Sequence, residues 1–238
     1  MQNTVLVTGA DRGLGLGLCE GLLKQGWIVY AGQYMPDWPD LTALQAQYQQ
    51  ALHVLALDVQ SIESAQAAAK TMRTQSIRLD MLINNAGVIT QNTPTVSEPQ
   101  DYAALHRVFD VNSLGPLRMV EAFLPLMQHS AFKRLCFVSS EAGSIARCKR
   151  TAWYGYCMSK AALNMAVKIM FNQLRPEGYS FRLYHPGWMR TYMSGTKNTQ
   201  GDMEPAEAAS KAVPFFLSDR PDEDTLALVD YLGQEWPW

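Results

Sequence analysis

Two side chains four residues apart carry the clearest chemistry in this sequence. The segment Tyr156-Cys-Met-Ser-Lys160 places a phenol and an amine on one face if it is helical. A free phenol loses its proton near pH ~10, and a neighbouring ammonium group favours the phenolate. Lowering the phenol pKa by about 3 units requires roughly 4 kcal/mol of differential interaction. The pair predicts a proton-transfer site, although this spacing also occurs in many pairs without chemistry.

A glycine-rich segment near the N-terminus could bind phosphate. The segment Thr8-Gly9-Ala-Asp-Arg-Gly13-Leu-Gly15 contains three glycines. It follows a short apolar run and precedes an amphipathic stretch. At such a strand-to-helix turn, backbone N–H groups point at the ligand and small residues let phosphates approach them. The spacing is not G-x-G-x-x-G, and a tight turn without a ligand is the alternative.

The elements that would position these residues alternate between strand and helix. Short apolar runs with little polar alternation predict strands that are covered on both faces. They fall at residues 4–7, 27–30, 53–57, 81–83, 135–138, 181–184 and 226–229. Helices are predicted after Gly13 and over residues 41–48, 61–74, 101–127, 156–174 and 204–216. Ser61 and Pro205 mark two helix starts. We expect an α/β fold, with residues 1–238 forming a single domain.

Four spaced motifs resemble the short-chain dehydrogenase/reductase family. They are the T-G-x-x-x-G-x-G turn, Asp58-Val59, Asn84-Asn-Ala-Gly87, and Pro186-Gly187 with Thr191 downstream. A closer similarity to the C-factor/sniffer-like carbonyl reductases lies in segments 12–18 and 154–164 and in the Trp-Pro-Trp ending. The resemblance implies a Rossmann fold, a doubly wound parallel sheet of about seven strands with helices on both faces.

The resemblance also assigns catalytic roles. Tyr156 would exchange the alcohol proton, Lys160 would lower the pKa of Tyr156 and bind the nicotinamide ribose, and Ser140 would polarise the substrate carbonyl. Ser139 is the alternative to Ser140. Asn112 matches the family's asparagine that kinks a long helix and holds a water near the lysine, or it is an ordinary buried asparagine. The stretch 147–150 is a short insertion relative to the family, as in the C-factor/sniffer-like branch.

The family pattern implies a nicotinamide cofactor. NADP is favoured over NAD because Arg12 stands where a basic residue can bind a 2′-phosphate, and because the end of the second strand carries Gln33 rather than an acid. Gln33 weakens the preference, since relatives often have arginine there. The expected cofactor-binding residues are Gly9, Asp11, Arg12, Gly13, Leu14, Gly15, Gln33, Asp58, Val59, Asn85, Ala86, Gly87, Tyr156, Lys160, Pro186, Gly187, Met189 and Thr191.

The expected reaction is the interconversion of a ketone or aldehyde and an alcohol by hydride transfer. Trp153, Tyr154, Trp188 and Tyr192 indicate an aromatic substrate pocket, although each is as readily a packing residue. The alternatives are an NAD-dependent alcohol dehydrogenase of the same family and a non-catalytic NAD(P)-sensing protein on the same fold.

Bulk properties narrow the classes of partner. A net charge of -2 disfavours nucleic acid and anionic membranes. The N-terminus lacks the features of a secretory signal, and no apolar run reaches the roughly 18 residues of a membrane span, so a cytoplasmic protein is expected. The four cysteines and four histidines show no zinc-ligand spacing, so no metal is expected. The family resemblance is consistent with a homodimer or homotetramer, and the carbonyl-reductase-like branch also includes monomers.

Overall fold

One mostly parallel sheet organises the chain. The computed structural model describes residues 2–238, whose strands form a sheet in the order β3-β2-β1-β4-β5-β6-β7-β8. All neighbours pair in parallel except β7 and β8, which are antiparallel. The strands are β1 (Thr4–Val7), β2 (Ile28–Gln33), β3 (Leu52–Ala56), β4 (Met81–Asn84), β5 (Arg134–Val138), β6 (Ser180–His185), β7 (Leu228–Asp230) and β8 (Glu235–Trp236).

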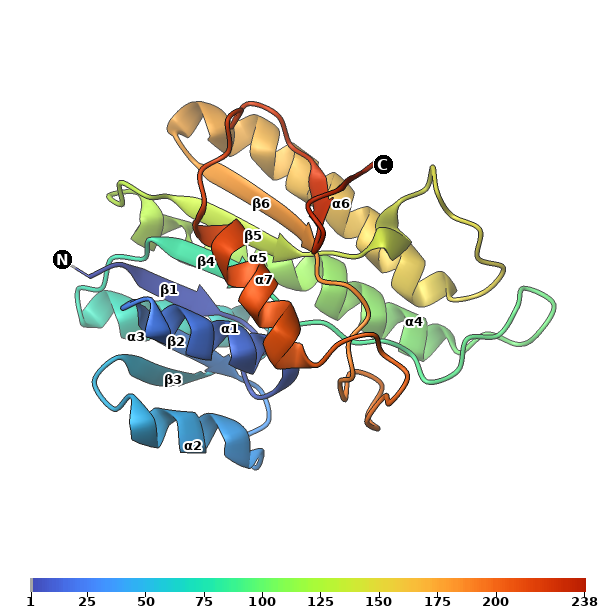
Figure 1. The fold of residues 1–238 in the computed structure, drawn as a ribbon, viewed down its shortest axis with the longest axis horizontal. Helices are drawn as coiled ribbons and strands as arrows, with labels where there is room; N and C mark the ends of the chain where they lie inside the picture. The colour runs from blue at the N-terminus through green and yellow to red at the C-terminus, as the bar shows by residue number, and fades with distance from the viewer. Residues whose placement is uncertain (1) are drawn as a thin grey trace.

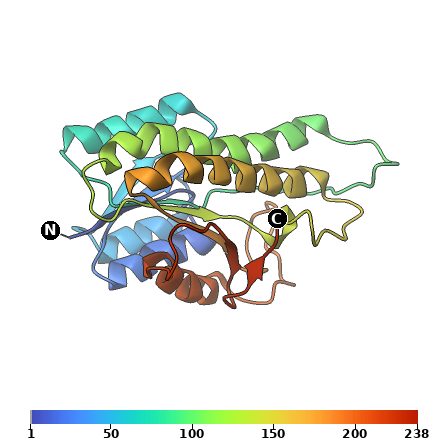
Figure 2. The same cartoon turned by 90° about the horizontal axis from the view of Figure 1, so that it is seen from above.

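Helices cover both faces of the sheet (Figures 1 and 2). On one face lie α1 (Gly13–Lys24), α2 (Pro39–Gln47) and α7 (Pro205–Leu217). On the other lie α3 (Ile62–Thr74), α4 (Tyr102–Phe109), α5 (Gly115–Met127) and α6 (Tyr154–Leu174). A π-helical turn (Asp110–Leu114) joins α4 to α5, and three-residue 3₁₀ turns cover Glu141–Gly143 and Arg175–Glu177.

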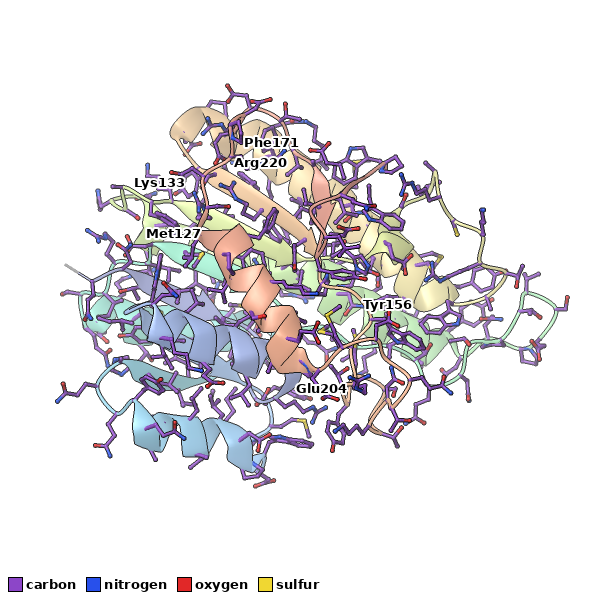
Figure 3. All side chains as sticks on the ribbon, viewed as in Figure 1. Met127, Lys133, Tyr156, Phe171, Glu204 and Arg220 are labelled. Atoms are coloured by element: carbon purple, nitrogen blue, oxygen red, sulfur yellow. The ribbon has the colours of Figure 1, made fainter. Side chains whose placement is uncertain are left out.

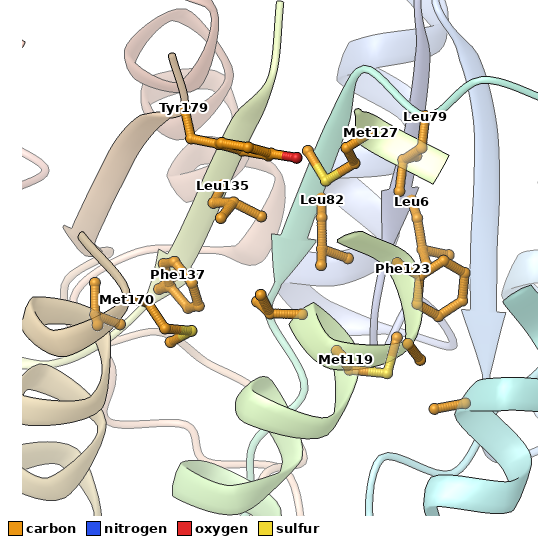
Figure 4. Packing of buried hydrophobic residues seen from close by; sticks show 14 of the residues in the cluster. Leu6, Leu79, Leu82, Met119, Phe123, Met127, Leu135, Phe137, Met170 and Tyr179 are labelled. Carbon is orange, nitrogen blue, oxygen red and sulfur yellow. The ribbon is translucent and has the colours of Figure 1, made fainter. Parts of the chain in front are cut away.

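Local sequence explains where several helices begin. The Ser61 side chain accepts a hydrogen bond from the Ser64 N–H at 3.1 Å and caps α3. Pro39 and Pro205 occupy first helical positions, where a missing N–H costs nothing. The core has two parts, one on each face of the sheet. Figure 4 shows the part beneath α5 and α6, where Phe123 and Met119 pack against Leu82 and Leu6 of the strands.

The predicted α/β Rossmann-type fold, with helices on both faces, is confirmed. The strand number differs, because β8 adds an antiparallel edge strand that the sequence did not predict. The helix predicted over residues 101–127 is interrupted by the π-helical turn. The helix carrying Tyr156 begins at Tyr154 rather than at Tyr156 itself.

Candidate active site

The predicted site residues gather at the carboxyl edge of the sheet. Gly9 follows β1, Asn85 follows β4, Ser140 follows β5 and Pro186 follows β6. Because these strands run in the same direction, the residues after them meet at one edge. Figure 3 shows Tyr156 at this end of the molecule and Lys133, which precedes β5, at the other.

The glycine turn packs so closely against neighbouring backbone that it has no space for side chains at Gly9 and Gly15. Gly9 has a φ of +62°, and a Cβ there would lie 2.9 Å from Ala86 Cα. A Cβ on Gly15 would lie 2.1 Å from the Gly9 carbonyl oxygen. Helix α1 begins directly after this turn with no side-chain cap and no acidic residue in its first turn. Its first N–H groups therefore remain available for an anion, so the turn fits a dinucleotide pyrophosphate.

The segment Asn84–Gly87 holds this turn in place. Thr8 Oγ1 accepts hydrogen bonds from the backbone N–H groups of Asn85 and Ala86, each at 3.0 Å. The Asn85 side-chain amide donates to the Thr8 and Gly9 carbonyls at 2.9 and 3.1 Å. The segment thus links β1 to β4 at the point where a cofactor would cross the sheet.

Tyr156, Ser140 and Lys160 come together at the start of α6. Ser140 lies close enough to Tyr156 for its hydroxyl to lower the pKa of the phenol, and Ser140 Oγ accepts the Ala142 N–H at 3.1 Å. The Lys160 Nζ lies 5.7 Å from the Tyr156 ring centroid and donates to the Val138 carbonyl at 2.9 Å. Lys160 is only 3% exposed. The structure therefore brings the predicted phenol, hydroxyl and amine into one cluster.

Burial is the main cause of the pKa shifts of Tyr156 and Lys160. Although Tyr156 is only partly buried, burial raises its pKa to about 12, and the nearby Ser140 hydroxyl only partly opposes this. Burial lowers the pKa of Lys160 to about 8. The expected lowering of the Tyr156 pKa by Lys160 is therefore not found, because desolvation of the phenolate outweighs the opposing effects of Ser140 and Arg150.

Asn112 lies in the π-helical turn and is 1% exposed. Its side-chain amide donates to the Val88 carbonyl at 2.9 Å and to Ser159 Oγ at 3.0 Å, and its Oδ1 accepts the Val88 N–H at 2.9 Å. Asn112 thus ties the loop after β4 to the residue that precedes Lys160. Its expected role in holding a water stays a prediction.

Arg12 is surrounded by the loop after β2 and by residues far along the chain. Its guanidinium lies 4.4 Å from the Trp38 ring centroid, and it donates to the Tyr192 carbonyl at 3.3 Å. The neighbouring Asp11 is 6% exposed, and its Oδ1 accepts the N–H groups of Tyr34 and Met35 at 2.9 and 2.8 Å. Asp11 therefore shapes the loop after β2.

The other expected cofactor-binding residues lie along the same edge. The Thr191 side chain lies over Gly13, where a Cβ would meet it at 3.7 Å. Asp58 Oδ1 accepts the Gln60 N–H at 2.9 Å. Leu14, Gln33, Val59, Gly87, Pro186, Gly187 and Met189 occupy the segments that follow the strands or open α1. Their cofactor contacts stay predictions.

A pocket of about 350 Å³ lies between the end of β6 and the C-terminal strands, lined by Glu141, His185, Gly187, Trp188, Asp202, Asp230, Tyr231, Leu232, Gln234 and Trp236. Of the aromatics expected in a substrate pocket, Trp188 lines this one. Tyr192 instead packs against Trp38 at 5.1 Å, and Trp153 against Tyr156 at 6.4 Å between ring centroids. The pocket borders Glu141, the residue after Ser140.

Sequence reasoning missed several residues that shape the site. Trp38 and Met35 belong to the proline-rich segment Met35-Pro-Asp-Trp-Pro39, which no motif placed in the site. The one available signal was its position directly after β2, where dinucleotide folds bind the adenosine ribose. The Val138 carbonyl and Ser159 hydroxyl are further contacts that side-chain motifs do not indicate.

The chain was compared with known proteins. A sequence profile described as short chain dehydrogenase matches residues 3–202. The chain belongs to the short-chain dehydrogenase family. The family resemblance predicted from the motifs is thereby confirmed, and membership makes this protein an oxidoreductase.

Relatives within the family have differing functions. C-signal of Myxococcus xanthus is 41% identical over 160 residues, which cover 67% of this chain and 93% of that protein. The 1-hydroxy-2-glutathionyl-2-methyl-3-butene dehydrogenase of Rhodococcus sp. is 32% identical over 88% of each chain. The structure of an NADPH-bound carbonyl reductase from chicken fatty liver is 29% identical, covers all of both chains and has a TM-score of 0.84.

A short-chain dehydrogenase/reductase of Burkholderia multivorans with bound NADP is 27% identical over all of both chains, with a TM-score of 0.89. Within residues 2–238, no helix of this family member is both long enough and apolar enough to span a membrane.

Proposed function

We propose that the protein is an NADP(H)-preferring reductase that converts a small ketone or aldehyde to an alcohol. The observation that carries this proposal is the cluster of Ser140, Tyr156 and Lys160 at the carboxyl edge of the sheet. Because the pKa of Tyr156 is raised to about 12, the phenol is protonated at neutral pH. That is the form a proton donor to a reduced carbonyl must have.

Each residue of the cluster has a distinct task in this reaction. The Ser140 hydroxyl donates a hydrogen bond to the substrate carbonyl oxygen and stabilises the charge that develops there. Tyr156 transfers its proton to the same oxygen. A bound nicotinamide supplies the hydride that reaches the carbonyl carbon. Lys160 holds a positive charge that stabilises the resulting phenolate until the proton is replaced.

The residues present fit a dinucleotide. The turn carries no side chains at Gly9 and Gly15, and α1 presents an uncapped N-terminus without an acidic residue in its first turn. The turn at residues 9–15 would hold the pyrophosphate, Asp58 and Val59 the adenine, and Asn85–Gly87, Pro186, Gly187, Met189 and Thr191 the nicotinamide end. Lys160 and Tyr156 would bind the nicotinamide ribose.

Preference for NADP is supported by charge at the end of β2. No acid occupies the strand end, which reads Tyr30-Ala-Gly-Gln33, and Arg12 lies beside the following loop. A carboxylate there would repel a 2′-phosphate, whereas a guanidinium can bind it through several hydrogen bonds. The NADP and NADPH bound to the two related structures agree with this preference.

The compartment and assembly state are part of the same proposal. Cys19, Cys136, Cys148 and Cys157 are free thiols, in keeping with the reducing cytoplasm. Nucleic acid and membranes are not proposed as partners, because the net charge is close to zero. Exposed apolar side chains on α4, the π-helical turn, α5 and α6 support a homodimer or homotetramer; they include Phe109, Leu114, Leu117, Met165 and Ile169.

The decisive test compares two tyrosines in one helical turn. We expect Tyr156→Phe to bind NADPH as the wild type does but to lose about 10²- to 10⁴-fold in kcat, because its proton donor is missing. Tyr154→Phe is the matched control and should keep its turnover. Initial rates with a panel of ketones and aldehydes measure the effect. A Tyr156→Phe protein with full turnover would remove Tyr156 from the mechanism.

Cofactor titrations separate this proposal from its alternatives. Parallel calorimetric titrations with NADPH and NADH should show tighter binding of NADPH. Tighter binding of NADH would favour an NAD-dependent alcohol dehydrogenase. Binding of either cofactor without turnover on any carbonyl or alcohol would favour a sensing protein on the same fold.

A further inference from the structure

The Arg12 side chain lies where three distant segments meet. Its guanidinium carbon is 4.4 Å from the Trp38 ring centroid and 5.9 Å from that of Tyr192. Nη1 donates to Met35 Sδ at 2.9 Å, and Nη2 donates to the Tyr192 carbonyl at 3.3 Å. The Trp38 and Tyr192 rings also contact each other edge to face, with centroids 5.1 Å apart. The turn after β1, the loop after β2 and the loop after β6 therefore form one aromatic enclosure around this cation.

Trp38 is itself held in position. It occupies the N-cap of α2, directly before Pro39 at the first helical position, where the proline ring restricts the backbone. The Trp38 indole N–H donates to Asp40 Oδ2 at 3.0 Å. The loop that leads to it is fixed by Asp11, which accepts two of its backbone N–H groups. These contacts therefore fix the position of the indole against which the guanidinium stacks.

This enclosure leaves Arg12 able to bind an anion. A guanidinium has five N–H donors, and two of its nitrogens donate to a thioether sulfur and a backbone carbonyl, neither of which carries a charge. Asp11 and Asp40, two of the carboxylates on these segments, accept hydrogen bonds from other groups. Stacking on an aromatic ring fixes the plane of the guanidinium while its edge stays free for hydrogen bonds.

We propose that Trp38 is a positioning residue that selects the cofactor through Arg12. By holding the guanidinium, Trp38 prepares it to bind a phosphate monoester on the adenosine ribose and so favours NADP(H) over NAD(H). This inference rests on the proposed preference for NADP(H). Tyr192 completes the enclosure from loop 188–202, and its more distant ring should contribute less than Trp38.

The test uses nucleotides that lack the nicotinamide, so that the readout does not depend on catalysis. Titration calorimetry of the purified full-length protein would measure the affinities for 2′,5′-ADP and 5′-ADP, and for NADPH and NADH. We expect Trp38→Ala to weaken the two 2′-phosphorylated ligands about three- to tenfold, the range for a partly exposed cation–aromatic contact. Affinities for 5′-ADP and NADH should change less than twofold.

Two further variants distinguish positioning from a general structural effect. Trp38→Phe should restore most of the preference, because a phenyl ring still offers a face to the guanidinium. Tyr34→Ala removes a 53% exposed aromatic from the same loop and should change nothing. In an Arg12→Ala background, Trp38→Ala should have no further effect on the ratio of the two ADP affinities.

The outcomes separate this inference from the function on which it rests. If the wild type binds 2′,5′-ADP no more tightly than 5′-ADP, the NADP preference fails and the inference fails with it. If the wild type shows the preference but Trp38→Ala keeps it, or weakens all four ligands equally, only the role of Trp38 is overturned.

Discussion

At the scale of single residues, the site combines an acid that stays protonated with a cation held out of water. Burial raises the pKa of Tyr156 and lowers that of Lys160, and both shifts come from the same loss of solvent. The Tyr156 shift helps a reductase, which needs a proton donor. The Lys160 shift is a cost in stability that the protein bears for its function.

Replacing Lys160 should therefore stabilise the fold while abolishing activity. The fall in the Lys160 pKa from 10.5 to about 8 corresponds to about 3 kcal/mol of destabilisation at neutral pH. The penalty is fully present below pH ~8 and disappears as the pH rises toward ~10.5, because only the unfolded state is then protonated. We expect Lys160→Met to unfold at a higher temperature at pH 7, with the gap to wild type closing by pH 10.5.

Thermal unfolding across this pH range measures the effect. Lys168→Met is the matched control, because Lys168 lies exposed on the same helix, and it should change stability little at any pH. A Lys160→Met protein that is less stable than wild type at pH 7 would show that the hydrogen bond to Val138 outweighs the cost of burying the charge.

Alanine substitutions of the two serines after β5 should have different effects on kcat. Ser139 is 2% exposed and donates to Asn164 Oδ1 at 2.6 Å, whereas Ser140 contacts Tyr156. We expect Ser140→Ala to lower kcat about 10²-fold or more; because Ser140 Oγ also accepts the Ala142 N–H at 3.1 Å, the variant should lose about 1 kcal/mol of stability as well. Ser139→Ala should lose about 1 kcal/mol of stability and keep its turnover. Steady-state kinetics and urea unfolding of both variants decide this; the opposite pattern would move the oxyanion contact to Ser139.

Sequence could predict which side chains the fold brings together but not their surroundings. The spacing of Tyr156 and Lys160 predicted their common helix face, which the structure places at the carboxyl edge. The direction of the Tyr156 pKa could not be read from spacing, because it depends on how much solvent the fold excludes. Likewise, the contact of Arg12 with Trp38 depends on the path of a loop, which has no periodic signal.

At the scale of elements, the π-helical turn between α4 and α5 joins the helices that support the site. Such a wide turn within a helix is rare and frequently occurs at functional sites. Here it places Asn112 between Val88 and Ser159. Ser113, the next residue, donates its hydroxyl to the Ser159 carbonyl at 2.8 Å. The turn therefore meets α6 one residue before Lys160.

Asn112 and Ser113 offer a matched pair for testing this turn. Asn112→Ala leaves the Val88 N–H and carbonyl without their partner and should cost about 2–6 kcal/mol, from the 1–3 kcal/mol typical of each buried unpaired group. We expect its kcat to fall as well, measured well below its melting temperature. Ser113→Ala removes one hydrogen bond and should cost about 1 kcal/mol with kcat unchanged. Equal losses of kcat in both variants would indicate that general loosening of α6 is the cause.

The elements themselves were largely predictable, and the exceptions have physical reasons. Cap residues such as Ser61 and Pro205 mark helix starts by local chemistry, which is why those starts agree. The strand β8 has only two residues, Glu235 and Trp236, too few to show an alternating pattern. The apolar pattern continues across residues 110–114, so periodicity predicted one helix where the resemblance alone indicated a kink.

At the scale of the whole molecule, the two edges of the sheet have different tasks. The carboxyl edge holds the proposed active site, and buried arginines lie nearer the amino edge. Arg134 opens β5, and Arg182 lies two residues after the start of β6. Both are nearly inaccessible, at 2% and 0% exposed. Arg182 pairs with both carboxylate oxygens of Glu223, at 2.9 and 2.6 Å, and so ties the segment between α7 and β7 to the sheet.

Removing this partner should affect stability but not chemistry. Glu223→Gln leaves the buried Arg182 charge without its counter-charge, which typically costs about 3–5 kcal/mol.

The effect of this substitution should depend on pH. Burial raises the pKa of Glu223, but hydrogen bonds from Arg182 and the Arg220 N–H outweigh this effect, so the pKa lies below 4.5. The stabilisation is therefore present above pH ~4.5 and is lost as the pH falls through the folded-state pKa. The gap between wild type and Glu223→Gln in urea unfolding should be large at pH 7 and should shrink below pH 4. Because the pair lies away from Ser140 and Tyr156, kcat at low temperature should stay at the wild-type value. A gap that does not depend on pH would show that Glu223 acts through shape rather than charge.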